Sequence, residues 1–176
     1  MIVILLNGHP QSGKDTFADV AMEKYFESHK HSTIDACCEF AQTMGWDGIK
    51  NAKSRRMLSD LKKFYVEHFD GPFRDLINDI KWAKNTNLDL FFTFSREGSE
   101  IERIKMWCKE EGIPFFYIFV IRDEDGIDYG NDSDNNVGDG PEPDYICHNK
   151  WHTVEDYKKE ILMVIKELLD KYNQKV

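Results

Sequence analysis

The sequence has no long apolar run, no excess of basic residues and no paired arrangement of cysteines. Its most apolar stretch, residues 115–121, is far shorter than the roughly 18 residues of a membrane-spanning helix, so we expect no membrane partner. Lys and Arg total 23 against 32 Asp and Glu, a net charge of −9, which argues against a nucleic-acid-binding surface. The four cysteines form neither a Cys-x-x-Cys pair nor a disulfide framework, which favours reduced thiols in a cytoplasmic protein.

Enough apolar material is nevertheless present to fill a core. Of the 176 residues, 41% are hydrophobic and 13% aromatic, a composition that excludes an intrinsically disordered chain. The length suits one globular domain and is short for two, so we expect a single domain over residues 1–176.

Short apolar runs alternate with longer amphipathic stretches. Strands are expected at residues 2–6, 32–35, 88–94, 115–121 and 144–147. Helices are expected at residues 17–29, over most of 36–84 with breaks near 45–48 and 70–72, at 99–111, and from a capping box at Thr153 and Asp156 onward. Apolar strands separated by helices indicate a parallel sheet covered on both faces. The sequence therefore predicts a three-layer α/β/α fold with about five parallel strands.

The most specific motif lies between the first strand and the first helix. It reads Gly-His-Pro-Gln-Ser-Gly-Lys-Asp-Thr and covers residues 8–16. A strand before it and a helix after it give the context that a phosphate-binding loop requires. Gly8 and Gly13 let the backbone turn tightly, the helix dipole attracts an anion, and Lys14 can reach the β- and γ-phosphates of a nucleotide. The expected nucleotide-binding residues are Gly8, Pro10, Gln11, Ser12, Gly13, Lys14, Asp15 and Thr16.

The motif departs from the usual pattern directly after the lysine. A Ser or Thr that binds Mg²⁺ usually stands there, but this sequence has Asp15, and the hydroxyl follows at Thr16. Thr16 and Asp15 are the expected metal-binding residues. Asp15 has two other interpretations: it faces the acceptor substrate, or it only stabilises the first turn of the helix electrostatically.

A strand, phosphate loop and helix at the N-terminus, with the form Gly-Lys-Asp-Thr, resemble the phage deoxynucleoside monophosphate kinases and related small P-loop kinases. The chain is also similar to adenylate kinases, which have a Gly between the Lys and the Thr. Three looser segments extend the resemblance: residues 45–48 with 54–62, residues 94–97 with Glu100, and residues 144–149 before the last helix. In order, they resemble the acceptor-side region, the strand-end arginine and the closing strand with its Asn turn.

The resemblance implies a P-loop kinase that uses ATP and Mg²⁺, with residues 36–84 as a helical acceptor-side region and 122–143 as a lid-like loop. Lys14, Arg96 and Arg122 would be the catalytic residues. Arg96 also stands at the carboxyl end of an expected strand, where ligands bind in open α/β sheets. The alternative for Arg96 is a surface ion pair with Glu97 or Glu100.

Three further residues are candidates for binding the acceptor. Arg55 and Arg56 lie on an expected helix and point about 100° apart, so only one of them can face a given cleft. Asp35 is expected at the end of a strand and is either a cleft residue or purely structural.

The lid-like segment departs from the kinase pattern. Residues 123–142 contain eight acidic residues and no Lys or Arg. The expected activity is therefore transfer of the ATP γ-phosphoryl group to a small phosphorylated acceptor, first of all a (deoxy)nucleoside monophosphate. Two alternatives remain: a kinase of another phosphorylated metabolite such as a coenzyme precursor, and a nucleotide-binding regulatory module without catalysis. The sequence leaves the oligomeric state open.

Overall fold

The computed structural model describes residues 1–25, 27–122, 140–150 and 153–173. Its elements in chain order are β1 (Ile2–Asn7), α1 (Lys14–Lys24), β2 (Ser28–Ser32), α2 (Asp35–Thr43), α3 (Ala52–Phe69), α4 (Gly71–Asn85), β3 (Leu90–Phe94), α5 (Gly98–Glu110), β4 (Phe115–Ile121), β5 (Tyr145–His148) and α7 (Val154–Asn173).

The five strands form one sheet in the order β2-β3-β1-β4-β5, and every neighbouring pair is parallel. β1 occupies the middle, with Leu5 paired to Thr93 on one side and to Tyr117 on the other. All six residues of β1 are buried, as the apolar sequence of a strand covered on both faces predicts. The carboxyl ends of all five strands therefore meet at one edge of the sheet.

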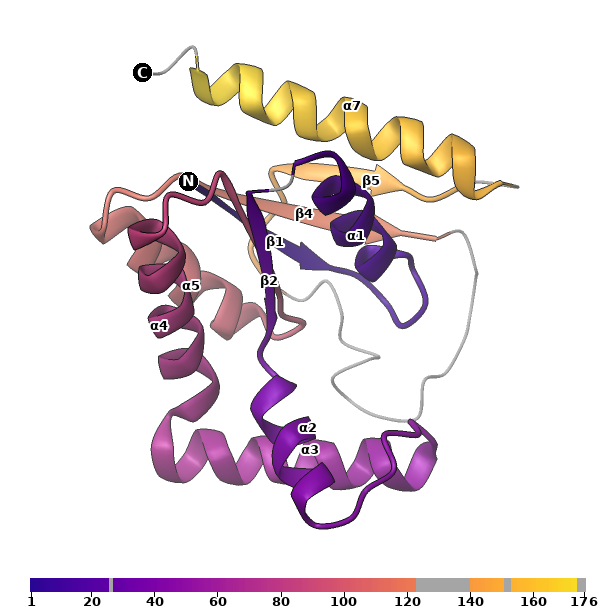
Figure 1. Cartoon of the computed structure of the whole chain (residues 1–176), viewed down its shortest axis with the longest axis vertical. Coiled ribbons are helices and arrows are strands. Elements are labelled where there is room, and N and C mark those ends of the chain that lie inside the picture. The colour runs from indigo at the N-terminus through magenta and orange to yellow at the C-terminus, as the bar shows by residue number, and fades with distance from the viewer. Residues whose placement is uncertain (26, 123–139, 151–152, 174–176) are drawn as a thin grey trace.

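Helices cover both faces of the sheet (Figure 1). Alternate β1 residues point to opposite faces: Ile2, Ile4 and Leu6 pack with α1 and α7, whereas Val3 and Leu5 pack with α4 and α5. The expected three-layer α/β/α fold with five parallel strands is confirmed.

Helices α2 and α3 form a smaller unit beyond the end of β2, at the bottom of Figure 1. Their shared core contains only three fully buried residues, Cys37, Ala41 and Leu58, with partly buried neighbours around them. α3 begins with a capping box in which the side chains of Asn51 and Ser54 each accept a hydrogen bond from the other's backbone N–H.

The second expected strand is misplaced. The expected strand covered residues 32–35 and the expected helix ran to residue 29, whereas the structure has β2 at Ser28–Ser32. α1 ends at Lys24, and the polar residues after it pair with β3. β2 is an edge strand, so it lacks the apolar run by which the other strands were recognised. Asp35 is consequently the first residue of α2, not the end of a strand.

α1 begins at Lys14, three residues before the expected start, and α3 begins at Ala52, with three residues between it and the expected break. The other boundaries agree within two residues. α5 begins at Gly98 with Glu97 as its N-cap; the sequence suggested instead that Ser99 caps this helix, which is wrong. α7 begins after a capping interaction in which Thr153 and Asp156 bond each other, as expected. Asp70 precedes α4, but its carboxylate binds Arg103 rather than the helix.

The four cysteines are free thiols. Among the described residues, no helix has the length and apolar character needed to cross a membrane. Most of the expected lid-like loop, residues 123–139, lies outside the described part of the chain.

Candidate functional site

The loop between β1 and α1 is anchored where it begins. The side-chain oxygen of Asn7 accepts a hydrogen bond from the backbone N–H of Gly8 (2.7 Å), and its amide donates to the hydroxyl of Tyr117 (3.0 Å). Asn7 is buried at the end of the middle strand, so these bonds fix the direction in which the chain leaves the sheet.

The two glycines of the motif are required by their conformation and by close neighbours. Gly8 has φ 151° and Gly13 has φ 100°, in the region that favours glycine. A Cβ at Gly8 would lie 2.3 Å from the carbonyl oxygen of Val120, and one at Gly13 would lie 2.6 Å from the side-chain nitrogen of Asn149. The loop is thus pressed against the ends of β4 and β5.

Several groups within the loop are committed to holding its shape. The backbone N–H of Ser12 donates to the carbonyl of His9 (3.2 Å), and Gln11 adopts a left-handed conformation with φ 64°. Pro10 has no N–H and that of Ser12 is already bonded, whereas the first N–H groups of α1 have no partner within the helix and can bind an anion. The buried hydroxyl of Ser12 has no hydrogen-bond partner among the described residues.

Lys14 is the charged group at the mouth of this loop. Its side chain is buried, and Nζ donates to the carbonyl of His9 (3.1 Å). Burial, reinforced by the positive charge of Arg96 and opposed by Asp15, lowers the pKa of Lys14 to about 8. A buried cation with a lowered pKa gains from a bound anion, because an anion restores the electrostatic stabilisation that burial removed.

Arg96 brings a second positive charge to the same place from the end of β3. It follows Phe94 by two residues and is half-buried. Burial and the nearby guanidinium of Arg55 lower the pKa of Arg96, whereas Asp15 opposes the shift. The structure therefore brings Lys14, Asp15, Arg55 and Arg96 together from three places in the chain, up to 82 residues apart in sequence.

His9 belongs to this charged group, although the sequence motif did not single it out. Burial lowers the pKa of His9, and the positive charges of Lys14 and Arg96 lower it further. A variable position inside a loop motif carries no signal of its own, so only the fold could show this proximity.

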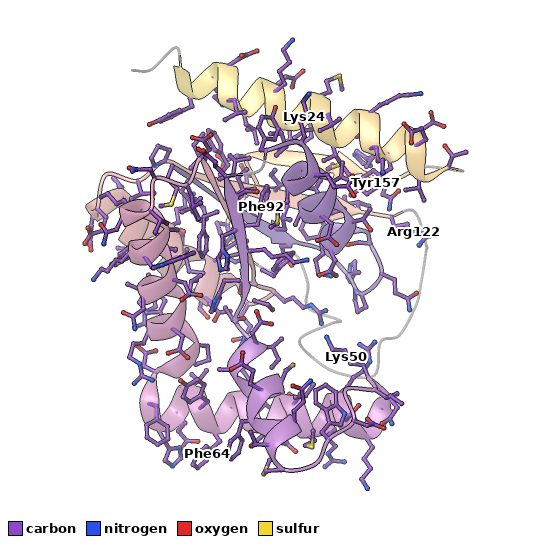
Figure 2. The ribbon with its side chains drawn as sticks, viewed as in Figure 1. Lys24, Lys50, Phe64, Phe92, Arg122 and Tyr157 are labelled. Atoms are coloured by element: carbon purple, nitrogen blue, oxygen red, sulfur yellow. The ribbon has the colours of Figure 1, made fainter. Side chains whose placement is uncertain are left out.

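Two contacts from the C-terminal part of the chain hold the loop from the other side. Asn149 donates to the carbonyl of Ser12 (2.9 Å), and the hydroxyl of Tyr157 donates to the carbonyl of Gly13 (3.2 Å). Tyr157 lies on α7 beside α1 (Figure 2). The sequence pointed to Asn149, because an Asn directly follows the last strand, but it gave no indication of the contact from Tyr157.

Arg122, expected to be catalytic, lies exposed at the end of β4. Its guanidinium donates to the carbonyl of Gln11 (3.4 Å), which connects the end of β4 to the loop.

The remaining acceptor candidates separate. Arg55 and Arg56 are both exposed. The charge of Arg55 lowers the pKa of Arg96. Arg56 instead lines a shallow groove of about 510 Å³, together with Lys53, Asp60 and Phe64. The carboxylate of Asp35 is exposed and accepts from the backbone N–H of Ser32 (2.8 Å), which stabilises the turn into α2.

The two expected metal-binding residues lie in the first turn of α1. Thr16 is half-buried, and Asp15 is exposed on the side of Lys14 and Arg96. The described residues contain no cluster of three or more His, Cys, Asp or Glu that could hold a metal ion. A hydroxyl and a carboxylate nonetheless suit Mg²⁺, which takes few protein ligands and completes its shell with phosphates and water.

No family model matches the chain, and no curated protein matches its sequence. Solved structures do match it. The APS kinase of Mycobacterium tuberculosis, in complex with AMPPNP and APS, has a TM-score of 0.57 at 13% identity and covers 94% of this chain and 97% of its own. A candidate kinase from Chloroflexus aurantiacus has a TM-score of 0.57 at 15% identity over 96% of both chains. A sugar kinase from a Janibacter species has a TM-score of 0.54 at 12% identity, covering 94% of this chain and 95% of its own. These likenesses, with the five-stranded parallel sheet between helices, show that the chain has the fold of P-loop kinases.

Proposed function

We propose that the chain transfers the γ-phosphoryl group of ATP to a small phosphorylated acceptor, with (deoxy)nucleoside monophosphates as the first candidates. The observation that supports this most strongly is the cationic group at the carboxyl edge of the sheet. Lys14 and Arg96 lie close enough for Arg96 to lower the pKa of Lys14, on a chain whose net charge is −9. Like charges brought together and partly buried are unfavourable unless anions neutralise them.

The donor side is the loop and the start of α1. Lys14 and the first N–H groups of α1 would bind the β- and γ-phosphates of ATP, and the contacts from Asn149 and Tyr157 would hold the loop in place before ATP binds. Thr16 and Asp15 would hold Mg²⁺, which when bound neutralises the charge of the phosphates during transfer. Such chemistry depends on positioning and charge, not on a nucleophilic side chain.

The acceptor side is formed by Arg96, with Arg55 facing it from α3. A guanidinium can bind a phosphate through two parallel hydrogen bonds, which suits the holding of a phosphorylated acceptor opposite the donor. Arg122 would stabilise the moving phosphoryl group from beyond the loop. Arg56 lies in a different groove and would take no part.

The structural neighbours support nucleotide binding without naming the acceptor. One neighbour is an APS kinase in complex with AMPPNP and APS, and another is a sugar kinase. A cationic acceptor side fits a phosphorylated acceptor better than a neutral sugar, because a phosphate carries negative charge that Arg96 and Arg55 attract and a neutral sugar carries none.

Labelled ATP and Mg²⁺ incubated with a panel of acceptors tests the proposal. The panel contains the common ribo- and deoxyribonucleoside monophosphates, APS, phosphorylated coenzyme precursors and unphosphorylated sugars. Labelled product with a monophosphate supports the proposal, and product with another phosphorylated compound changes only the acceptor.

A thermal melt with Mg-ATP separates the remaining outcomes. Mg-ATP could stabilise the wild type and Lys105→Ala but not Lys14→Ala, while no acceptor is phosphorylated. That result would indicate a regulatory module without catalysis. No stabilisation of the wild type at millimolar nucleotide would refute the proposal.

A further inference from the structure

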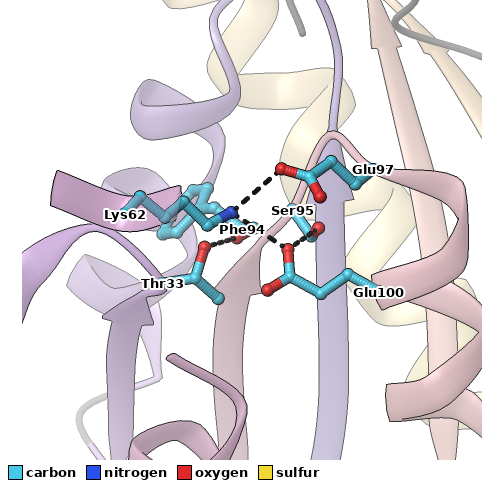
Figure 3. A network of polar contacts seen from close by, with 6 residues as sticks. All are labelled: Thr33, Lys62, Phe94, Ser95, Glu97 and Glu100. Carbon is cyan, nitrogen blue, oxygen red and sulfur yellow. Dashed lines mark hydrogen bonds and ion pairs between the residues drawn. The ribbon is translucent and has the colours of Figure 1, made fainter. Parts of the chain in front are cut away.

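Lys62 connects α3 to the chain around Arg96 and has no assigned role in the proposed reaction. Its amino group lies 3.4 Å from Glu97 Oε1 and 3.3 Å from Glu100 Oε2 (Figure 3). The side chain of Lys62 is only 18% exposed, and that of Glu100 only 12%. This ion pair is shielded from water, so it holds its two elements more firmly than a surface pair would.

The two residues that flank Arg96 in the sequence, Ser95 and Glu97, both take part in this network. The hydroxyl of Ser95, directly before it, donates to the same Glu100 oxygen that Lys62 binds, and Glu97, directly after it, binds Lys62. Figure 3 shows the amino group of Lys62 between the two carboxylates at this turn. Both chain neighbours of Arg96 are therefore fixed to one cluster, and Glu97 and Glu100 are engaged by Lys62.

The same helix carries Arg55, whose positive charge lowers the pKa of Arg96. Arg55 and Lys62 are seven residues apart on α3, which is nearly two full turns, so their side chains leave the same face of the helix. Arg55 and Arg96 repel each other, whereas Lys62 attracts the turn that carries Arg96. The repulsion between Arg55 and Arg96 would move α3 away from the end of β3, and the ion pairs of Lys62 with Glu97 and Glu100 oppose that movement.

We infer that Lys62 is a positioning residue that sets the separation of Arg55 and Arg96, and so shapes the site for the acceptor phosphate. This inference rests on the proposed function for its kinetic consequence. The amino group of Lys62 is bound by the carboxylates of Glu97 and Glu100. It acts through Glu97 and Glu100 on the turn that carries Arg96.

Kinetics of Lys62→Met, Lys62→Arg and the control Lys63→Met test the inference, because Lys63 is exposed on the same helix. The assay uses the monophosphate that the wild type phosphorylates best. Lys62→Met should raise the KM for the monophosphate about tenfold and leave the KM for ATP within about twofold, as expected when one charge-assisted contact loses its geometry. Lys62→Arg should restore most of the loss, and Lys63→Met should behave as the wild type.

Amide exchange of the ligand-free protein keeps the inference testable if the reaction is misassigned. Exchange at residues 95–98 should be faster in Lys62→Met and unchanged in Lys63→Met. Should the wild type phosphorylate no acceptor, the proposed function fails, and this exchange decides on Lys62 alone. Unchanged exchange in Lys62→Met, or a parallel rise of both KM values, overturns the inference.

Discussion

At the scale of the residue, Lys14 shows that the site costs stability. Its pKa is about 8 in the fold against 10.5 for a free lysine, so the folded state holds an unfavourable charge at neutral pH. That difference corresponds to about 3 kcal/mol, of which the hydrogen bond to His9 offsets about 1. Lys14→Met should therefore raise the free energy of unfolding without nucleotide at pH 7 by about 2 kcal/mol.

The pH dependence of this gain has a defined sign. Between pH 8 and pH 10.5 the unfolded wild type binds more protons than the folded one, so wild-type stability rises and the advantage of Lys14→Met shrinks. Urea unfolding over this range measures the difference, with Lys105→Met as a variant that should show no such trend. A Lys14→Met protein less stable than wild type at pH 7 would contradict the prediction.

Arg96 gives a prediction about function at the same scale. Arg96→Ala should lower kcat/KM for the acceptor about 100-fold and leave the dissociation constant for ATP nearly unchanged, because it removes a charge-assisted contact on the acceptor side only. Arg55→Ala should have a smaller effect in the same direction, and Arg56→Ala none. Steady-state kinetics and ATP titration distinguish these cases. Equal losses for ATP and acceptor would show that the donor and acceptor sides are assigned wrongly.

Single residues differ in how far the sequence reveals them. The position of Lys14 could be predicted because it depends on local spacing, namely a strand, a glycine loop and a helix. The position of Arg96 just beyond a strand could be predicted from the apolar run before it. The proximity of Arg55 rather than Arg56, and of His9, depends on how α3 is rotated and how the loop closes, which no local pattern encodes.

At the scale of the element, the end of the glycine-containing loop is held by α7, the last helix, through the hydrogen bond from Tyr157 to Gly13. Burial raises the pKa of Tyr157, so its hydroxyl remains a neutral donor to Gly13. Tyr157→Phe should lower the free energy of unfolding by about 1 kcal/mol and weaken ATP binding severalfold, because the loop loses one of its two C-terminal contacts. Thermal melts and ATP titration measure both effects, with Tyr172→Phe on the same helix as the control. Unchanged ATP affinity in Tyr157→Phe would show that the loop holds its shape without α7.

Strands with a continuous apolar run were predictable from the sequence, whereas a polar edge strand formed by pairing with its neighbour was not. β1 and β4 have continuous apolar runs and were found within one residue. β2 has the sequence Ser-His-Lys-His-Ser, and its pairing with β3 makes it a strand, so its polar pattern alone did not predict its bounds.

At the scale of the whole molecule, the buried core is divided unequally. The sheet separates two large apolar clusters, one with α1 and α7 and one with α4 and α5. The unit of α2 and α3 has a third cluster with only three fully buried residues. Since apolar burial is the main stabilising term, this unit should open at a lower free energy than the sheet.

Native-state amide exchange in low denaturant tests this division of stability. Amides of α2 and α3 should exchange through openings that depend weakly on denaturant, because little surface is exposed, whereas those of β1 and β4 should follow global unfolding. An acceptor held by Arg55 on α3 and Arg96 on the sheet would join the two parts. ADP with the preferred monophosphate should therefore slow exchange in α3 more than ADP alone. Equal protection of α3 and β1 in the free protein would show that α2 and α3 unfold only with the sheet, and the acceptor side would then be rigid before any substrate binds.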